Sequence, residues 1–217
     1  KTHISKIVTG VTASMALLEA ALQADADAIL VHHGYFWRGE SQPITGIKKL
    51  RIQFLLQHHI NLFAYHLPLD AHPELGNNVM LAKQLGLNVT GRAGEKDLLL
   101  LTELTAPQSL QTFANLIETK LNRTPQVIGD LQKPVKTVAL CTGAAQGYIE
   151  QALAANVDAY ISGEISEQTV HVARESGMSY ISAGHHATER YGIQALGEHL
   201  AQKLGLQHTF IDCDNPV

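Results

Sequence analysis

The chain has 217 residues, of which 45% are hydrophobic and 17% charged, and it contains 17 glycines. This length and composition exclude a disordered or fibrous protein and predict a soluble globular α/β protein, built as one large domain or as two small intertwined ones. The formal net charge is −4, from 16 basic and 20 acidic residues without a long run of one sign, and this charge does not support nucleic-acid binding.

The sequence also indicates the cellular compartment of the protein. No apolar run approaches the roughly 20 residues of a membrane-spanning helix, and no charged-then-apolar leader is visible. Cys141 and Cys213 are too few for a disulfide framework. We therefore expect a cytoplasmic protein without a membrane partner. Because the chain begins with Lys1 and its first strand starts almost at once, we also expect the natural chain to extend further upstream.

Apolar patterning predicts alternating strands and helices. Strands are expected at 4–11, 27–31 and 62–65, and helices at 14–23, 47–59 and 76–85. Beyond these, the pattern predicts a strand at 98–104, a helix at 107–121 opened by Pro107, and a loop at 123–134 with a short strand. We divide the chain into a first α/β repeat (1–90), a middle insertion (91–135) and a second α/β repeat (136–217).

The division follows from an internal repeat. An offset of 131 residues aligns Ile7 with Val138, Asp27 with Asp158, and His32 and His33 with Gly163 and Glu164. An offset of 119 residues aligns His66 with His185, Asp70 with Glu189, and Gly86 with Gly205. Two α/β units can look alike by chance, since they share apolar strands and glycine caps. The matching spacing of a histidine and an acid favours a true duplication.

The histidines and acids follow predicted strands, and open α/β sheets bind ligands at the carboxyl ends of their strands. If the repeats face each other, His32, His33 and Asp70 of the first meet His185 and Glu189 of the second. Imidazole and carboxylate donors suit zinc, iron or manganese. Five ligands exceed one catalytic zinc site, so we predict two divalent ions roughly 3.5–4 Å apart.

Several alternatives stay open at this point. His32 and His33 could be structural, and as strand neighbours they would point apart unless a sharp turn follows. Asp70 could cap a helix that begins near residue 72. Glu189 alone would be an ordinary acid on a helix surface. Glu164 and His66 are candidates for orienting the ligands or for transferring a proton.

Four motifs together carry a resemblance to a known family. They are Ile29-Leu30-Val31-His32-His33-Gly34-Tyr35-Phe36-Trp37, His66-Leu67-Pro68-Leu69-Asp70, Gly163-Glu164-Ile165-Ser166-Glu167-Gln168 and Gly184-His185-His186-Ala187-Thr188-Glu189. With them the chain resembles, over nearly its whole length, the YbgI-like proteins. These form the family of GTP cyclohydrolase I type 2 homologues, also named for an NGG-one-interacting factor.

The resemblance implies two intertwined, duplicated α/β halves with mixed sheets, a dinuclear metal site between the halves, and a ring-shaped homohexamer. It implies as metal ligands His32, His33, Asp70, His185 and Glu189. The family usually has a helical segment before the first strand, and this chain lacks it, which bears on the packing of the hexamer.

Three functions are consistent with these features. The first is a metal-dependent hydrolase in which metal-activated water attacks an unknown small substrate, with Glu164 and His66 in accessory roles. The second is purine ring opening of the GTP cyclohydrolase type, although no glycine-rich phosphate cradle is present. The third is a non-enzymatic regulatory or scaffold ring in which metal stabilises the fold.

Overall fold

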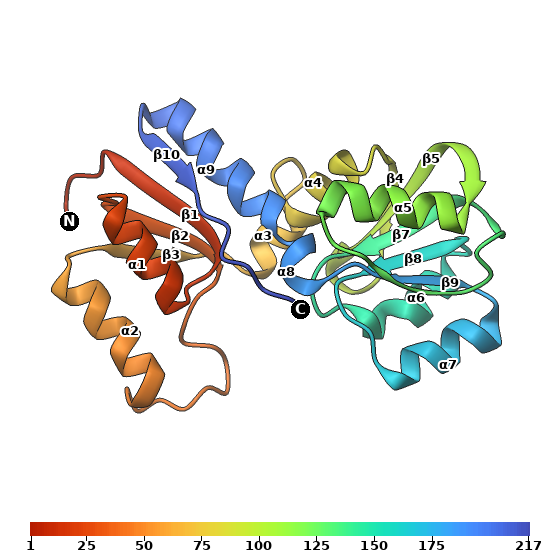
Figure 1. Ribbon diagram of the computed structural model, residues 1–217, viewed down its shortest axis with the longest axis horizontal. Helices are drawn as coiled ribbons and strands as arrows, with labels where there is room; N and C mark the ends of the chain where they lie inside the picture. The colour runs from red at the N-terminus through yellow and green to blue at the C-terminus, as the bar shows by residue number, and fades with distance from the viewer. The chain divides into compact units, whose positions relative to one another are not determined.

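The computed structural model describes residues 1–217 and contains two β-sheets with helices packed on them (Figure 1). The predicted α/β class is confirmed. Contacts within the chain divide it into two compact units. Unit 1 comprises Lys1–Leu69 and Gly192–Asp214, and unit 2 comprises Asp70–Tyr191 and Asn215–Val217.

Unit 1 is built on a four-stranded parallel sheet with the strand order β10-β1-β2-β3. Its elements are β1 (Lys6–Thr12), α1 (Met15–Gln23), β2 (Ala28–His33), α2 (Gly46–Gln57), β3 (Asn61–Ala64), all but the start of α9 (Arg190–Leu204), and β10 (Gln207–Phe210). Neighbouring residues of β2 point to opposite faces of the sheet. Ile29 packs with α1, whereas Leu30 packs with Ile193 of α9. Burial on both faces explains the continuous apolar sequence of Ala28–Val31 in β2.

Unit 2 is built on a six-stranded mixed sheet with the order β4-β5-β7-β8-β9-β6, in which β7, β8 and β9 are parallel. Its helices are α4 (Asn77–Gln84), α5 (Leu110–Leu121), α6 (Ile149–Ala154), α7 (Glu167–Ser176) and α8 (His185–Thr188), with short 3₁₀ turns at Glu95–Asp97 and Gln146–Tyr148. Its strands are β4 (Asn88–Ala93), β5 (Leu99–Ser109), β6 (Gln126–Ile128), β7 (Pro134–Cys141), β8 (Ala159–Ser162) and β9 (Ser179–Ser182). The short helix α3 (Leu67–Ala71) begins in unit 1 and ends in unit 2.

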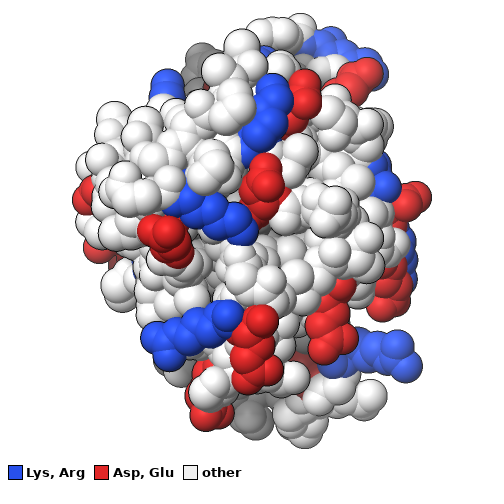
Figure 2. All heavy atoms as spheres, turned by 90° about the vertical axis from the view of Figure 1, so that its right-hand side faces the viewer, with Lys and Arg blue, Asp and Glu red and all other residues white.

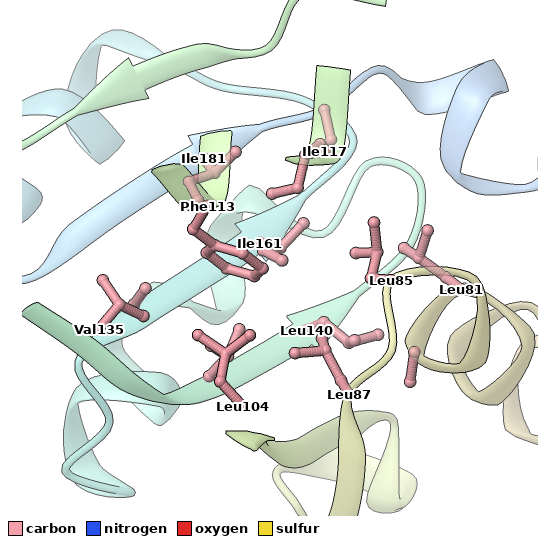
Figure 3. Close-up of a cluster of buried hydrophobic side chains, with 14 of the residues drawn as sticks. Leu81, Leu85, Leu87, Leu104, Phe113, Ile117, Val135, Leu140, Ile161 and Ile181 are labelled. Atoms are coloured by element: carbon pink, nitrogen blue, oxygen red, sulfur yellow. The ribbon is translucent and has the colours of Figure 1, made fainter. Parts of the chain in front are cut away.

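The largest apolar cluster of unit 2 lies between its sheet and the helices α4 and α5. Figure 3 shows Phe113 and Ile117 of α5 beside Ile161 and Ile181 of the sheet. The predicted middle insertion therefore supplies a helix to the core and the strands β5 and β6 to the sheet. Residues of this segment are as deeply buried as those of the repeats, because Phe113 and Ile117 have no exposed surface.

One expected boundary is wrong. Pro107 does not open the helix, because it lies in β5, and α5 begins at Leu110 after the N-cap Ser109. The Ser109 side chain accepts a hydrogen bond from the backbone N–H of Thr112 at 3.2 Å. This bond satisfies an N–H group at the start of the helix, and proline has no side-chain acceptor that could do the same. Proline is tolerated in β5 where the pairing with β7 is interrupted, between Glu103 and Gln108.

Each of the two units contains the same pattern of hydrogen bonds from backbone N–H groups to an aspartate. Asp27, before β2, accepts bonds from the backbone N–H groups of Ser5 and Lys6 at 2.8 and 3.0 Å. Asp158, 131 residues later, accepts bonds from the two corresponding residues at 2.9 and 2.8 Å. The register of β1 on β2 recurs in β7 on β8 with the same offset. These matches support the predicted duplication.

The repeats differ in where their last strand pairs. Strand β4 follows the first repeat but pairs with β5 in unit 2, whereas β10 follows the second repeat and pairs with β1 in unit 1. Each repeat thus gives its final strand to the other unit's sheet, which is the intertwining that the family resemblance implied.

Charged side chains are mixed on the face shown in Figure 2, where Lys and Arg alternate with Asp and Glu over a largely uncharged surface. None of the helices is long and apolar enough to span a membrane.

Asp158 provides a test of the repeated hydrogen bonds. Burial tends to raise the pKa of this carboxyl group, but the hydrogen bonds from Thr137 and Lys136 outweigh burial and lower it. A lowered folded-state pKa means that ionised Asp158 stabilises the fold at pH values above about 4 and that this contribution is lost as the pH falls through the folded-state value.

We therefore expect Asp158→Asn to lower the free energy of unfolding at pH 7 by about 1–3 kcal/mol and the deficit to shrink below about pH 4. Urea unfolding followed by circular dichroism at several pH values measures both effects. Glu175→Gln, at an exposed position of α7, is the control. An Asp158→Asn protein as stable as the wild type at pH 7 would contradict the assignment.

Candidate metal centre

Strand β2 ends in two histidines whose rings lie near each other rather than on opposite faces. The ring centroids of His32 and His33 are 4.6 Å apart. The next residue, Gly34, passes so close to β3 that a Cβ atom there would overlap the Cβ of Ala64. His66 follows β3, and its ring centroid lies 4.9 Å from that of His32 and 5.4 Å from that of His33. Unit 1 therefore gathers three imidazoles, hereafter the histidine cluster.

The histidine cluster has the donor arrangement of a metal site. One ring nitrogen of each residue lies within 4.8 Å of the others. The Nδ1 atom of His32 donates a hydrogen bond to the carbonyl oxygen of Tyr65 at 2.9 Å, and Nδ1 of His33 lies 3.1 Å from Oγ1 of Thr12. A proton on Nδ1 puts the lone pair on Nε2, and such contacts are how proteins orient metal-binding imidazoles.

Unit 2 contains a second group of donors around His185, at the start of α8. Nδ1 of His185 donates to Oε1 of Glu164 at 2.6 Å, while Nε2 lies 3.1 Å from Oε2 of Glu189. The spacing of four residues places His185 and Glu189 on one side of the helical turn. Glu164 thus lies where a carboxylate orients a metal-binding histidine from behind.

The two carboxylates also change the titration of His185. Its pKa is raised to about 9, chiefly because Nε2 interacts with Glu189, with a further contribution from Glu164; burial acts in the opposite direction. An environment that stabilises a proton on this ring has a negative electrostatic potential. It therefore favours a cation at the same place, whether a proton or a metal ion.

Asp70 does not cap a helix near residue 72, because it lies inside α3 and α4 begins only at Asn77. Its Oδ1 atom accepts hydrogen bonds from the Asn77 side chain at 2.8 Å and from Oγ1 of Thr142 at 3.4 Å. An Asp70 oxygen and a Glu189 oxygen lie within 4.8 Å of each other. We call Asp70, His185 and Glu189 the carboxylate cluster.

Glu189 is not a surface acid, since only 3% of it is exposed, and Asp70 is also buried. Two buried carboxylates this close repel each other unless a cation or a proton lies with them. The donors therefore fit a divalent metal ion. The structure brings together His32, His33 and His66 in unit 1, and it brings together Asp70, Glu164, His185 and Glu189 in unit 2.

Two glycines make room for the carboxylate cluster. Gly143, with a φ of +69°, lies where any Cβ atom would overlap Oε1 of Glu189. A Cβ atom at Gly163 would lie 2.6 Å from the carbonyl oxygen of Gly143 and 2.7 Å from Cα of His185. Because Gly163 is the counterpart of His32 in the repeat, the second repeat has no space for a histidine there.

Sequence reasoning missed the residues that support this site. Asn77 and Asn78 are completely buried, and Asn78 bonds Thr142 while Asn77 bonds Asp70. Consecutive asparagines at a helix start, directly after Gly76, are the signal that could have marked them, because asparagine is rarely buried without a specific partner. Trp37, beside the histidine cluster, was also missed as a site residue.

The fold and the two clusters define a class of protein: a two-sheet α/β protein whose imidazoles and carboxylates suit divalent metal ions. The model of the Duf34/NIF3 (NGG1p interacting factor 3) family matches residues 1–216. The chain belongs to this family, as the resemblance of its motifs predicted.

Its relatives share the fold over nearly the whole chain. A Pseudomonas aeruginosa protein named GTP cyclohydrolase 1 type 2 homolog is 54% identical over 218 residues, covering 99% of this chain and 86% of that protein. The Escherichia coli (strain K12) protein of that name is 52% identical, covering 100% and 87%. A solved structure described as protein ybgI, of unknown function, has a TM-score of 0.95 at 52% identity, covering 99% and 87%. TTHA1606 from Thermus thermophilus has a TM-score of 0.88 at 34% identity, covering 100% and 87%.

The close approach of Glu189 to Gly143 predicts that a methyl group added at Gly143 disturbs the carboxylate cluster. In Gly143→Ala the new Cβ displaces the Glu189 carboxylate, and the positive φ is strained as well. We expect the purified variant to retain its circular dichroism spectrum but to lose most of its bound divalent metal, measured by mass spectrometry. Gly147→Ala is the matched control, because no atom lies within 4 Å of its added Cβ. Full metal content in Gly143→Ala would contradict the placement of Glu189 in the site.

Proposed function

We propose that this protein binds two divalent metal ions through His32, His33, Asp70, His185 and Glu189 and hydrolyses a small-molecule substrate with them. The observation that carries the proposal is the pair of clusters. Three imidazoles lie within 4.8 Å of one another in unit 1, and unit 2 holds two buried carboxylates beside an imidazole. Together they offer the mixed nitrogen and oxygen donors of a two-metal site.

The path of the chain supports a site shared by both clusters. The chain passes from unit 1 to unit 2 between Leu69 and Asp70, and it returns between Tyr191 and Gly192. Asp70 lies four positions after His66, so even a fully extended chain allows their Cα atoms to be at most about 14 Å apart. Glu189 likewise lies just before the second crossing. One residue of each cluster, His66 and Asp70, therefore lies close along the chain to the first crossing.

A bound pair of divalent ions would supply Lewis acidity and lower the pKa of water toward about 7. The chain's own residues hold the donors in position. Glu164 keeps the proton of His185 on Nδ1, and its main chain is fixed by a bond from the Tyr180 hydroxyl to the Glu164 carbonyl at 2.5 Å. His66 is the residue we propose to hold or move a proton; it lies as close to His32 and His33 as a ligand would.

Metal analysis tests the binding half of the proposal. Protein purified without chelators and supplied with zinc, iron(II) or manganese is expected to hold two ions per chain. His32→Ala and Glu189→Ala should each lose metal, whereas His171→Ala, at an exposed position of α7, should keep both ions. Retention of two ions in both ligand variants would overturn the proposed ligand set.

A hydrolysis panel tests the catalytic half. Metal-loaded wild-type protein should turn over at least one nucleotide, formamide, ester or peptide, and Glu189→Ala should not. The panel includes GTP, scored by loss of purine absorbance with release of formate, because relatives carry a GTP cyclohydrolase homolog name. Full metal occupancy without turnover of any member would contradict hydrolysis and favour a metal-stabilised scaffold.

We also propose that copies of this chain associate with one another, as the hexameric ring of the family resemblance implies. The support is an exposed apolar surface on α2 and the segment before it. Ile47 and Leu50, three residues apart on one side of α2, are exposed, as is Ile44. Adjacent exposed apolar side chains of this size are typical of protein interfaces.

Ile47→Glu combined with Leu50→Glu is expected to shift the protein from a larger assembly to species approaching the 23.6 kDa chain mass. The reason is that two carboxylates are costly to bury in an apolar contact. Size-exclusion chromatography with light scattering measures the change, and Leu204→Glu, another exposed leucine of unit 1, is the control. A monomeric wild type would contradict the proposal.

We place the protein in the cytoplasm. The two cysteines, Cys141 and Cys213, form no disulfide. Burial raises the pKa of the Cys141 thiol to about 12, and Asp70 adds to the effect, so this cysteine is kept as an unreactive thiol. Unpaired thiols are usual in a reducing compartment.

A further inference from the structure

The single tryptophan of the chain lies against the histidine cluster. The ring centroids of Trp37 and His66 are 4.6 Å apart, with the two planes nearly perpendicular at 83°, and the centroid of His33 is 6.1 Å away. Although one side of the indole contacts these imidazoles, 41% of Trp37 is exposed. A large aromatic side chain thus remains accessible beside the proposed metal ligands.

The loop holds Trp37 in this place at a conformational cost. Phe36 has a φ of +66°, which a bulky L-residue rarely adopts, and backbone strain of this kind persists only where surrounding contacts enforce it. Here the contacts come from Glu40 and Lys48. Oε2 of Glu40 accepts a bond from the backbone N–H of Trp37 at 2.9 Å, while Oε1 of Glu40 lies 3.2 Å from Nζ of Lys48. The same Lys48 nitrogen lies 4.7 Å from the centroid of the Phe36 ring.

We propose that the exposed part of the Trp37 indole is a stacking platform for a planar heteroaromatic ring of the substrate. The inference rests on the proposed function, since the platform is useful where a substrate lies beside the metal ligands. Stacking on an indole favours any flat π-system over an aliphatic group of similar size. A ring held by Trp37 would place its substituents next to His33 and His66, where the chemistry is proposed to occur.

The neighbouring residue indicates a further property of the substrate. Arg38 follows Trp37, is exposed, and has no hydrogen bond or ion pair in the structure. An exposed guanidinium on the residue that follows the platform in the chain would suit an anionic substituent such as a phosphate or carboxylate. The substrate class that fits is a planar heteroaromatic compound, more strongly bound when it carries an anionic group.

Ligand binding at Trp37 can be followed by tryptophan fluorescence, because the chain has no other tryptophan. The experiment titrates full-length protein, with its metal content measured, with adenosine, guanosine, cytidine and their 5′-monophosphates while following tryptophan fluorescence. Ribose and ribose 5-phosphate are the aliphatic controls. We expect saturable quenching by at least one nucleoside, tighter for its monophosphate, and none by the sugars.

Variants separate stacking from other roles. Binding measured by calorimetry should weaken at least about tenfold in Trp37→Ala and be largely restored in Trp37→Phe. Leu131→Ala, which is also 41% exposed but lies in unit 2, should bind as the wild type does. Arg38→Gln should weaken the monophosphate but not the nucleoside.

Each contrary outcome has its own meaning. Absence of saturable quenching in protein that holds two ions overturns the platform and leaves the metal proposal standing. Protein without metal overturns the proposed function, while nucleoside quenching in that protein still supports the platform. If Trp37→Ala instead changes the mass measured by light scattering and nucleosides do not bind, Trp37 is a contact between copies of the chain, and the stacking proposal is wrong.

Discussion

The closeness of two buried carboxylates is the constraint on which the site depends. Oxygens of Asp70 and Glu189 lie within 4.8 Å of each other, and both residues are buried. Like charges in such surroundings repel each other unless a cation or a proton lies with them, and the pKa of His185 is raised because the same carboxylates surround it with negative charge. The supporting groups keep this costly arrangement in place: Asn77 bonds Asp70, Glu164 bonds His185, and Gly143 leaves room for the Glu189 side chain.

Duplication followed by divergence explains how one architecture supplies different candidate metal ligands. Both repeats present residues at the ends of corresponding strands, β2 and β8, with the same register to the preceding strand. The first repeat has His32 and His33 there, whereas the second has Gly163 and Glu164, because the main chain around His185 fills the space of a side chain at Gly163. The first repeat therefore contributes imidazoles from its strand, and the second contributes a carboxylate that orients a histidine.

Local patterns predicted most of this structure, and long-range pairings explain what they missed. Apolar runs and glycines predicted most strands and helices of the first 121 residues but missed α3 and β4, and the four-residue spacing of His185 and Glu189 predicted their contact. The local patterns did not predict that β4 and β10 each join the sheet of the other unit, because the sequence of a strand does not determine which sheet it pairs with. Pro107 misled because proline is as acceptable at an interrupted strand pairing as at a helix start. The approach of Trp37 to His66 joins residues far apart in the sequence, so spacing carried no sign of it.

We propose that the histidine cluster and the carboxylate cluster bind one pair of divalent ions. Anomalous X-ray diffraction from crystals of the metal-loaded protein, recorded on both sides of the metal absorption edge, would locate these ions. We expect two peaks roughly 3.5–4 Å apart, contacted between them by His32, His33, Asp70, His185 and Glu189. Peaks confined to one cluster, or the absence of any peak beside these residues, would contradict it.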